Sequence, residues 1–178
     1  MDVQAKSRTE TVLKLMNVFA WIAFILLMVY AGGVLFSYVL IVMDPAKARG
    51  FFPGRDMSGL LAYSEGHFTA VVGFIFTLAA MKAFVAYQAT KVISKVKLEN
   101  PFRTEVVWVL ESISYSLLVI WVVGIFAAAY ASWLGSYAVD MDDESASIAG
   151  LLVTGLVFVI SQVFKRGVEI QTENELTV

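Results

Sequence analysis

The chain has 178 residues, of which 59% are hydrophobic and 16% are charged, with a mean hydropathy of +0.76. Soluble domains are usually about 45–50% apolar, so this composition predicts an integral membrane protein. The 13 basic and 15 acidic residues nearly balance, which argues against direct nucleic-acid binding. The absence of cysteine excludes disulfides, thiolate metal sites and quinone-linked thiol chemistry.

Four apolar segments are long enough to cross a bilayer as helices, which takes about 20 residues for a hydrocarbon core of about 30 Å. We expect spans at residues 15–42, 67–87, 107–133 and 147–164, followed by a polar tail at residues 165–178. The first segment is too long for a cleavable signal, so we expect it to be retained. The predicted fold is all-α, a single-domain integral membrane four-helix bundle.

The segments between the spans also carry structural signals. The loop at residues 44–65 mixes prolines, glycines and aromatics, which predicts an ordered loop on the membrane surface with a short interfacial helix at residues 57–64. The second helix is expected to continue through Lys97 into water, because residues 87–97 contain no helix breaker. Pro101 ends this stretch, and a new helix is expected near Thr104, which can act as its N-cap.

The third span has small residues at four-residue intervals, on one helical face. They are Gly124, Ala128, Ser132 and Ser136. In lipid, helices associate by close van der Waals contact, so small residues mark packing faces. We expect this face to pack against a neighbouring helix.

The basic residues predict the orientation of the chain. With four spans, the termini and the loop between the second and third spans share one side. The cations of that side are Lys6, Arg8, Lys14, Lys82, Lys91, Lys95, Lys97, Arg103, Lys165 and Arg166, against Lys47, Arg49 and Arg55 on the other. Cytoplasmic loops are enriched in positive charge. We therefore expect a multi-pass protein of the inner (cytoplasmic) membrane, with both termini cytoplasmic and the acidic residues 140–144 outside.

Two ionisable residues lie inside the predicted spans, near the side expected to be cytoplasmic. Lys82 precedes the end of the second span, and Glu111 follows the start of the third. Charges in lipid are costly and usually pair, face the bundle interior or reach toward the surface. We predict an intramembrane ion pair between Lys82 and Glu111, since consecutive spans are usually neighbours. The alternative left open is a snorkelling lysine and an interfacial glutamate, each in contact with water.

No catalytic, cofactor or metal site is expected. His67 is the only histidine, so the chain cannot supply the histidine pair of a transmembrane b-type haem. The acidic residues 140–144 lack the glycine and the distal glutamate of an EF-hand loop. No nucleophile elbow, zinc-protease motif or phosphate-binding glycine loop occurs, so we expect no enzyme activity.

Two stretches carry a family resemblance. One is the turn Asn100-Pro101-Phe102 before the third span, and the other is the end of the chain, which follows the pattern F-K-x-G-x-x-L-x-x-E-N-D-L-T-V. The matching tail residues are Phe164, Lys165, Gly167, Glu173, Asn174, Leu176, Thr177 and Val178, while Ile170 and Glu175 replace the leucine and aspartate. The pair resembles an uncharacterised bacterial family of four-span membrane proteins, YoaS-like, with a domain of unknown function. Members of that family are often encoded beside a small Cro/C1-type helix-turn-helix regulator, which the resemblance implies as a candidate partner.

Charged residues on the expected cytoplasmic side form a predicted interaction surface. Its members are Lys91, Lys95, Lys97 and Arg103 in the loop, and Glu169, Glu173 and Glu175 in the tail. The acids could hold a basic DNA-binding protein, or they could pair with the cations of the loop, which is the interpretation we favour.

Three functional hypotheses follow. The first is a non-enzymatic, regulatory membrane protein that engages a soluble cytoplasmic partner through this surface. The second is a small transporter or permease accessory subunit, which requires a shared polar cavity. The residues of that cavity would be Asn17, Lys82, Gln88, Glu111 and Gln162. The third is a structural membrane protein with no ligand beyond the lipid bilayer.

Overall fold

The computed structural model describes residues 3–50, 52–53, 55–95, 103–137 and 146–175. Four long helices hold the predicted spans: α1 (Val3–Met43), α3 (Glu65–Lys95), α4 (Thr104–Leu134) and α5 (Ile148–Glu175). Each is long and apolar enough to cross a membrane. The shorter elements are η1 (Pro45–Arg49), α2 (Ser58–Tyr63) and η2 (Gly135–Tyr137). The predicted all-α four-helix membrane bundle is confirmed, and α2 is the short helix expected in the first long loop.

The ends of the helices follow local chemistry. α1 stops before Pro45, where Asp44 is extended and its side chain accepts a hydrogen bond from the amide of Ala46 at 3.3 Å. α4 ends at Gly135, whose φ of 57° is in the left-handed region that glycine adopts readily. At its other end α4 begins at Thr104, but the N-cap is Arg103, which is extended. The predicted cap was therefore one residue too late.

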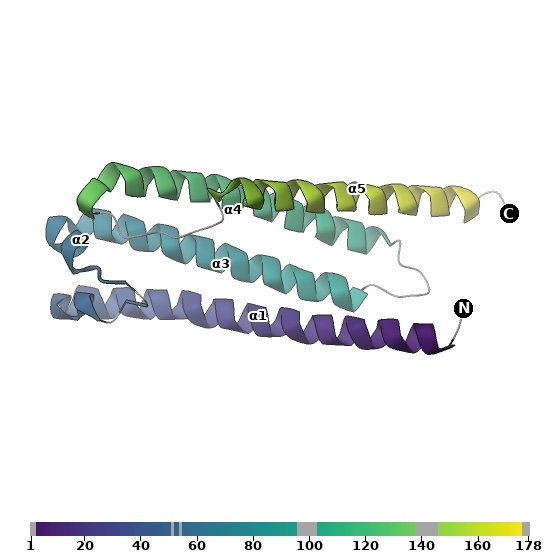
Figure 1. Ribbon diagram of the computed structural model, residues 1–178, viewed down its shortest axis with the longest axis horizontal. Helices are drawn as coiled ribbons and strands as arrows, with labels where there is room; N and C mark the ends of the chain where they lie inside the picture. Colours follow the sequence, from purple (N-terminus) through teal and green to yellow (C-terminus); the bar gives the residue numbers. More distant parts are fainter. Residues whose placement is uncertain (1–2, 51, 54, 96–102, 138–145, 176–178) are drawn as a thin grey trace.

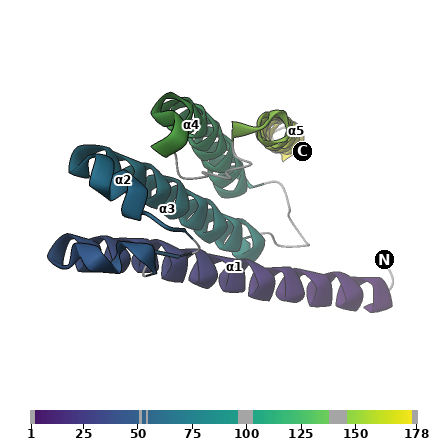
Figure 2. The ribbon, with the colours of Figure 1, turned by 60° about the vertical axis from the view of Figure 1, so that its left-hand side comes forward.

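The long helices pack in chain order, α1 on α3, α3 on α4 and α4 on α5 (Figures 1 and 2). Consecutive helices are antiparallel, so both termini lie at the same end of the molecule (Figure 1). Among the described residues, α1 has no close backbone contact with α4 or α5, and α3 has none with α5. The bundle is therefore open, with α1 and α5 as its two edges.

The largest buried cluster lies at the end opposite the termini. Side chains of the first long loop and of α2 enter it, where they pack against α1, α3 and the end of α4. Its buried members are Val34, Ile41, Phe52, Met57, Leu60, Phe68, Val71, Val72, Ile75 and Leu134. Elsewhere the edge helices are mostly uncovered: 22% of the apolar stretch of α1 and 11% of that of α5 is buried. Their exposed apolar side chains are the surfaces that face lipid.

The packing face of α4 differs from the one predicted. Gly124 is buried, but Ala128 and Ser132 are exposed, whereas Ala127 is buried. A Cβ added at Gly124 would lie 3.2 Å from the amide nitrogen of Ala146, so the glycine permits this close approach. The four-residue spacing correctly identified Gly124 as a packing residue. It did not show which face of the following turns is buried.

α5 begins beside the middle of α4 and not beside its end. The indole nitrogen of Trp121 donates a hydrogen bond to the carbonyl of Ser147 at 3.2 Å. α4 continues from Trp121 to Leu134, a rise of about 20 Å at 1.5 Å per residue. At the opposite end, α5 reaches beyond the start of α4 and the end of α3 (Figure 1). α5 is therefore displaced along its axis toward the termini.

Candidate functional site

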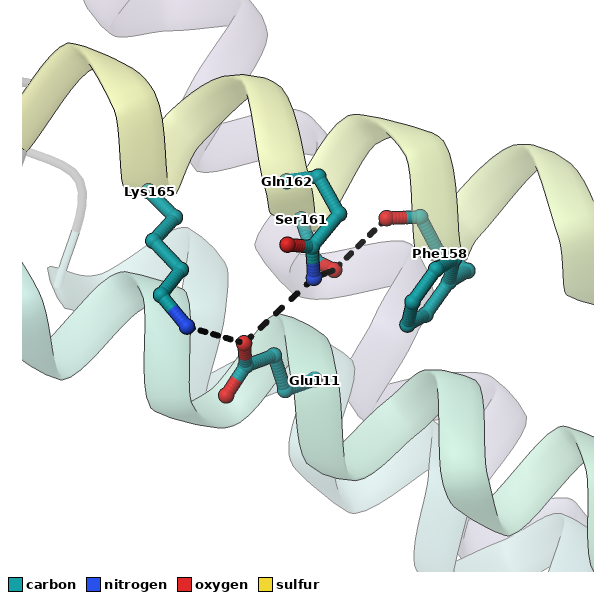
Figure 3. Close-up of polar contacts among 5 residues, drawn as sticks. All are labelled: Glu111, Phe158, Ser161, Gln162 and Lys165. Carbon is teal, nitrogen blue, oxygen red and sulfur yellow. Dashed lines mark hydrogen bonds and ion pairs between the residues drawn. The ribbon is translucent and has the colours of Figure 1, made fainter.

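Glu111 of α4 forms the centre of a polar bridge to α5 (Figure 3). Its carboxylate lies 3.8 Å from the ammonium of Lys165 and accepts a hydrogen bond from the amide of Gln162 at 3.5 Å. The side chain of Glu111 is 21% exposed and that of Lys165 is 54% exposed. We call Glu111, Gln162 and Lys165 the α4–α5 bridge. It is a charged contact within an interface that is otherwise mainly apolar.

The helix register separates Lys82 from Glu111. The amide nitrogen of Gln88 donates to the hydroxyl of Ser116 at 3.4 Å, so these two residues are level. Because α3 and α4 are antiparallel, Lys82 is level with about residue 122, some 16 Å from Glu111 along the helix. The structure does not bring the predicted ion pair together, and it gives Glu111 a cation on α5 instead. Span order alone indicated neither the register nor the direction of the Glu111 side chain.

Lys82 lies deeper in the bundle than the sequence indicated. It is near the middle of α3, with about 20 Å of helix between it and Lys95. It lines a cavity of about 150 Å³ between α1, α3 and α4, to which Tyr30 and Arg55 also contribute. Lys82 also lines a second cavity of about 400 Å³, between α3, α4 and α5. Lys82 therefore lies between two cavities and not at the edge of the span, where the sequence predicted it.

The described cations of the predicted interaction surface lie close to the place where α3 ends and α4 begins. Lys95 pairs with Glu105, in the first turn of α4, at 3.4 Å. Lys91 lies 4.4 Å from the centre of the Tyr87 ring, on its own helix, in a cation–π contact. Arg103 is the N-cap residue of α4. Each of these cations is thus located at or near the junction of α3 and α4.

The acids of the predicted surface lie on α5. Glu169 accepts a hydrogen bond from Arg166 at 2.8 Å, within a single turn of the helix. Glu173 is exposed, one turn further along. Lys97 and the side chain of Glu175 lie outside the described residues, as do the acidic residues 140–144. The described ion pairs join neighbouring turns or elements, and the pairing of the tail with the loop stays a prediction.

An aromatic cluster around His67 was not predicted. The Nδ1 atom of His67 is 2.6 Å from the hydroxyl of Tyr130, and Tyr63 stacks on the imidazole at 5.5 Å between ring centres. The Trp133 ring meets the imidazole edge-on at 5.4 Å, and Tyr137 stacks on Tyr63 at 4.3 Å. The only signal in the sequence is the concentration of aromatic residues at the span ends, which is typical of membrane interfaces. The contacts themselves join α2, α3, α4 and η2.

The polar residues required by the transporter hypothesis do not converge on one cavity. Glu111 and Gln162 meet between α4 and α5, whereas Gln88 contacts Ser116 between α3 and α4. Asn17 lies on α1, which has no close contact with α4 or α5 in the described residues. The side-chain oxygens of Asn17 and Gln88 are buried and have no hydrogen-bond partner in the described part of the chain. In the part of the chain that the structure describes, this arrangement provides no continuous polar path.

These features define the chain as a multi-pass membrane protein built from four spanning helices. Residues 13–178 match the family described as Protein of unknown function (DUF2975), and the chain belongs to this family. The membership confirms the predicted relation to a family of unknown function. No curated protein and no solved structure matches the chain. The YoaS-like name and the neighbouring regulator stay predictions.

Proposed function

We propose that this protein is a non-enzymatic, regulatory membrane protein that holds a soluble cytoplasmic partner at the membrane through the exposed end of α5. One observation supports this proposal above the others. α5 continues as a helix to Glu175, beyond the inner ends of α3 and α4 (Figure 1). A helix that only had to cross the membrane would not need this extension.

We call the part of α5 after Gly167, residues 168–175, the α5 extension. It has the composition of a binding surface. Ile170 is 47% exposed, and its neighbours include the exposed acids Glu169 and Glu173. Ile170 follows Lys165 and Arg166, the charges that mark the end of the apolar stretch, so its side chain is placed in water. An apolar residue flanked by acids fits a partner with an apolar contact and a basic rim.

The proposed partner is a small basic protein, of the kind that helix-turn-helix regulators represent. Such a protein carries cations for DNA, and the same cations would be attracted to Glu169 and Glu173. Binding at the membrane would then compete with binding to DNA. The cations at the α3–α4 junction, Lys91, Lys95 and Arg103, would orient the partner by repelling its basic face.

The orientation of the chain in this proposal rests on its positive charges. Cations cluster at the end of the molecule that holds both termini. Lys82 no longer counts among them because it lies deep in α3, and the bias without it is nine cations against three. Both ends of the chain, and with them the α5 extension, would face the cytoplasm.

Recruitment of a fluorescent partner to the membrane tests the proposal. The protein is co-expressed with a small basic helix-turn-helix protein fused to a fluorescent label, and the share of label at the membrane is measured by microscopy. We expect recruitment by the full chain and its loss when the chain is cut after Gly167, with membrane insertion unchanged. Recruitment by the shortened chain would contradict the proposal.

A charge-reversal variant tests whether recruitment depends on the acidic side chains of the α5 extension or only on the presence of the helix. Glu169→Lys combined with Glu173→Lys keeps the helix and reverses its charge, and we expect it to abolish recruitment. The matched control is Glu65→Lys, which alters an exposed acid at the opposite end of the molecule. Equal loss in both variants would indicate a general effect of net charge and would contradict a binding surface on α5.

A further inference from the structure

The cavity of about 400 Å³ between α3, α4 and α5 lies at the place where α5 begins. Its lining comes from all three helices and from the residue that precedes α5. The lining residues that matter below are Lys82, Val85, Leu117, Ser147, Val153 and Thr154. Ligand pockets commonly measure about 300–1,000 Å³, so this cavity can hold a small molecule or part of a larger one.

This cavity has a polar end and an apolar end. Lys82 is level with about residue 122 of α4, and Ser147 lies beside Trp121, whose indole nitrogen donates to its carbonyl at 3.2 Å. Lys82 and Ser147 therefore line the cavity at the same level. Val85 and Leu117 line it about one turn closer to the termini, and they are apolar.

The polar end offers hydrogen-bond donors. The hydroxyl oxygen of Ser147 accepts a hydrogen bond from the amide of Gly150 at 3.2 Å, and its hydrogen has no acceptor in the part of the chain that the structure describes. An ammonium has three N–H donors, so Lys82 can donate to a ligand alongside its other interactions. The hydroxyl hydrogen of Thr154 is already used, because it donates to the carbonyl of Gly150 at 2.9 Å. The ligand group that fits the polar end is therefore an acceptor.

The side of the cavity between α3 and α5 is open toward the lipid. These two helices have no close backbone contact among the described residues. Val153, which lines the cavity from α5, is 52% exposed. A ligand can therefore enter sideways from the bilayer, and an apolar chain attached to it can remain in the lipid.

The depth of the polar end favours an uncharged ligand. About 25 Å of helix separates Lys82 from Glu65, and about 20 Å separates it from Lys95. A phospholipid phosphate stays at the membrane interface, roughly 15 Å from the bilayer centre, because it is always charged. An uncharged lipid can bring a carbonyl to this depth, since the donors of the polar end then replace the hydrogen bonds to water.

We propose that this cavity binds an isoprenoid quinone, an uncharged lipid whose ring carries two carbonyl acceptors. One carbonyl accepts hydrogen bonds at the polar end, from Ser147 and Lys82. The ring packs against Val85 and Leu117, and the isoprenoid chain passes Val153 into the lipid. The proposal concerns binding alone, without electron transfer. The site is separate from the α5 extension, so its test is independent of the proposed regulatory function.

Photolabelling of the full-length protein tests the site. The purified chain is placed in nanodiscs of phosphatidylcholine, labelled with an isoprenoid quinone that carries an azide on its ring, and digested for mass spectrometry. We expect saturable labelling of peptides that contain Leu117 and Ser147. The same quinone without the azide should compete with the label. Squalene, which lacks carbonyls, oleic acid, which is charged, and a diacylglycerol, whose carbonyls are esters, should not compete.

Paired variants test the two ends of the cavity. Ser147→Ala should weaken binding roughly three- to tenfold, the effect of removing one neutral hydrogen bond, and Ser147→Thr should retain it. Ser94→Ala, which alters an exposed serine outside the cavity, should leave binding unchanged. Val153→Trp should narrow the opening to the lipid and abolish labelling. Val159→Trp, at an exposed position of the same helix outside the cavity, should have no effect.

The two pairs of variants act independently. If Ser147→Ala disturbs the start of α5, Val153→Trp still decides whether the cavity is occupied. The proposal is overturned if labelling does not saturate, or if Val153→Trp leaves it unchanged. Competition by squalene, oleic acid or the diacylglycerol as strong as that by the quinone would overturn the assignment of a quinone ligand.

Discussion

The carboxylate of Glu111 lies 3.8 Å from the ammonium of Lys165, and this contact ties α5 to α4. Among the long helices, α5 packs closely only against α4 in the described residues. Its position therefore depends on one interface, in which the α4–α5 bridge is the main charged contact. The bridge also precedes the α5 extension by a single turn, so it fixes the direction in which the extension leaves the membrane.

Removing Lys165 should destabilise the protein more than removing both members of the pair. Lys165→Met leaves the partly buried Glu111 without its cation, which should lower the free energy of unfolding by about 1–3 kcal/mol. Adding Glu111→Met should recover most of this loss, because two apolar side chains then face each other. Reversible unfolding in mixed micelles measures both effects.

The matched control for this prediction is Arg166→Met. Arg166 pairs with Glu169 on the exposed side of the same helix, and such solvent-exposed pairs contribute little to stability. Equal effects of Lys165→Met and Arg166→Met, or strictly additive effects in the double variant, would show that the bridge does not stabilise the interface.

The displacement of α5 predicts a specific disulfide. A Cβ at Gly124 would lie 3.5 Å from the Cβ of Ala146, close to the separation of about 3.8 Å in disulfides. Because the chain has no cysteine, the pair Gly124→Cys and Ala146→Cys should cross-link on mild oxidation without competing reactions. A mobility shift on a non-reducing gel, reversed by dithiothreitol, measures it.

A second cysteine pair makes this test discriminating. Gly155 lies nine residues after Ala146, about 14 Å further along α5, beyond the reach of a disulfide from position 124. The pair Gly124→Cys and Gly155→Cys should not cross-link. If it reacts and the first pair does not, α5 begins beside a different part of α4.

Much of the fold could be predicted because it depends on local patterns. Apolar runs of sufficient length identified the four spans, and the mixture of proline, glycine and aromatics identified the loop that contains α2. The start of α4 was predicted to within one residue, since Pro101 excludes a helix through that position. These signals require no knowledge of how the helices pack.

The candidate site could not be predicted because it depends on register and rotation. Lys82 and Glu111 lie on consecutive spans, as predicted, but a relative shift of about 16 Å separates them. Lys165 was interpreted as a residue of the tail, although α5 continues past it and brings it opposite Glu111. In lipid, apolar side chains occur on all faces of a helix, so sequence periodicity does not show which face packs.

Tyr130→Phe tests the hydrogen bond to His67. The 2.6 Å contact with Nδ1 would be lost while the ring packing remains, so the free energy of unfolding should fall by about 1 kcal/mol. Tyr130→Ala also removes the ring from between Phe74 and Trp133 and should cost about 3–5 kcal/mol. Thermal unfolding followed by circular dichroism compares the two, and equal losses would mean that the hydroxyl contact dominates over packing.

Gln88→Leu tests a buried amide whose oxygen has no partner among the described residues. Gln88 is 4% exposed, and its amide nitrogen makes a long hydrogen bond of 3.4 Å to Ser116. Replacing an incompletely bonded amide by an apolar group of similar size should change stability by less than about 1 kcal/mol or increase it. A larger loss, measured by the same unfolding assay, would indicate that a bound water or ligand satisfies the oxygen.

Site-specific photo-crosslinking at position 170 in living cells tests most directly the claim that the α5 extension binds a soluble protein. A photoreactive amino acid replaces Ile170, and the control places it at Val159, an exposed apolar position in the spanning part of the same helix. We predict one discrete adduct with a soluble protein at position 170, lost when Glu169→Lys and Glu173→Lys are added, and none at position 159. Adducts only with lipid or with the chain itself at both positions would contradict the account.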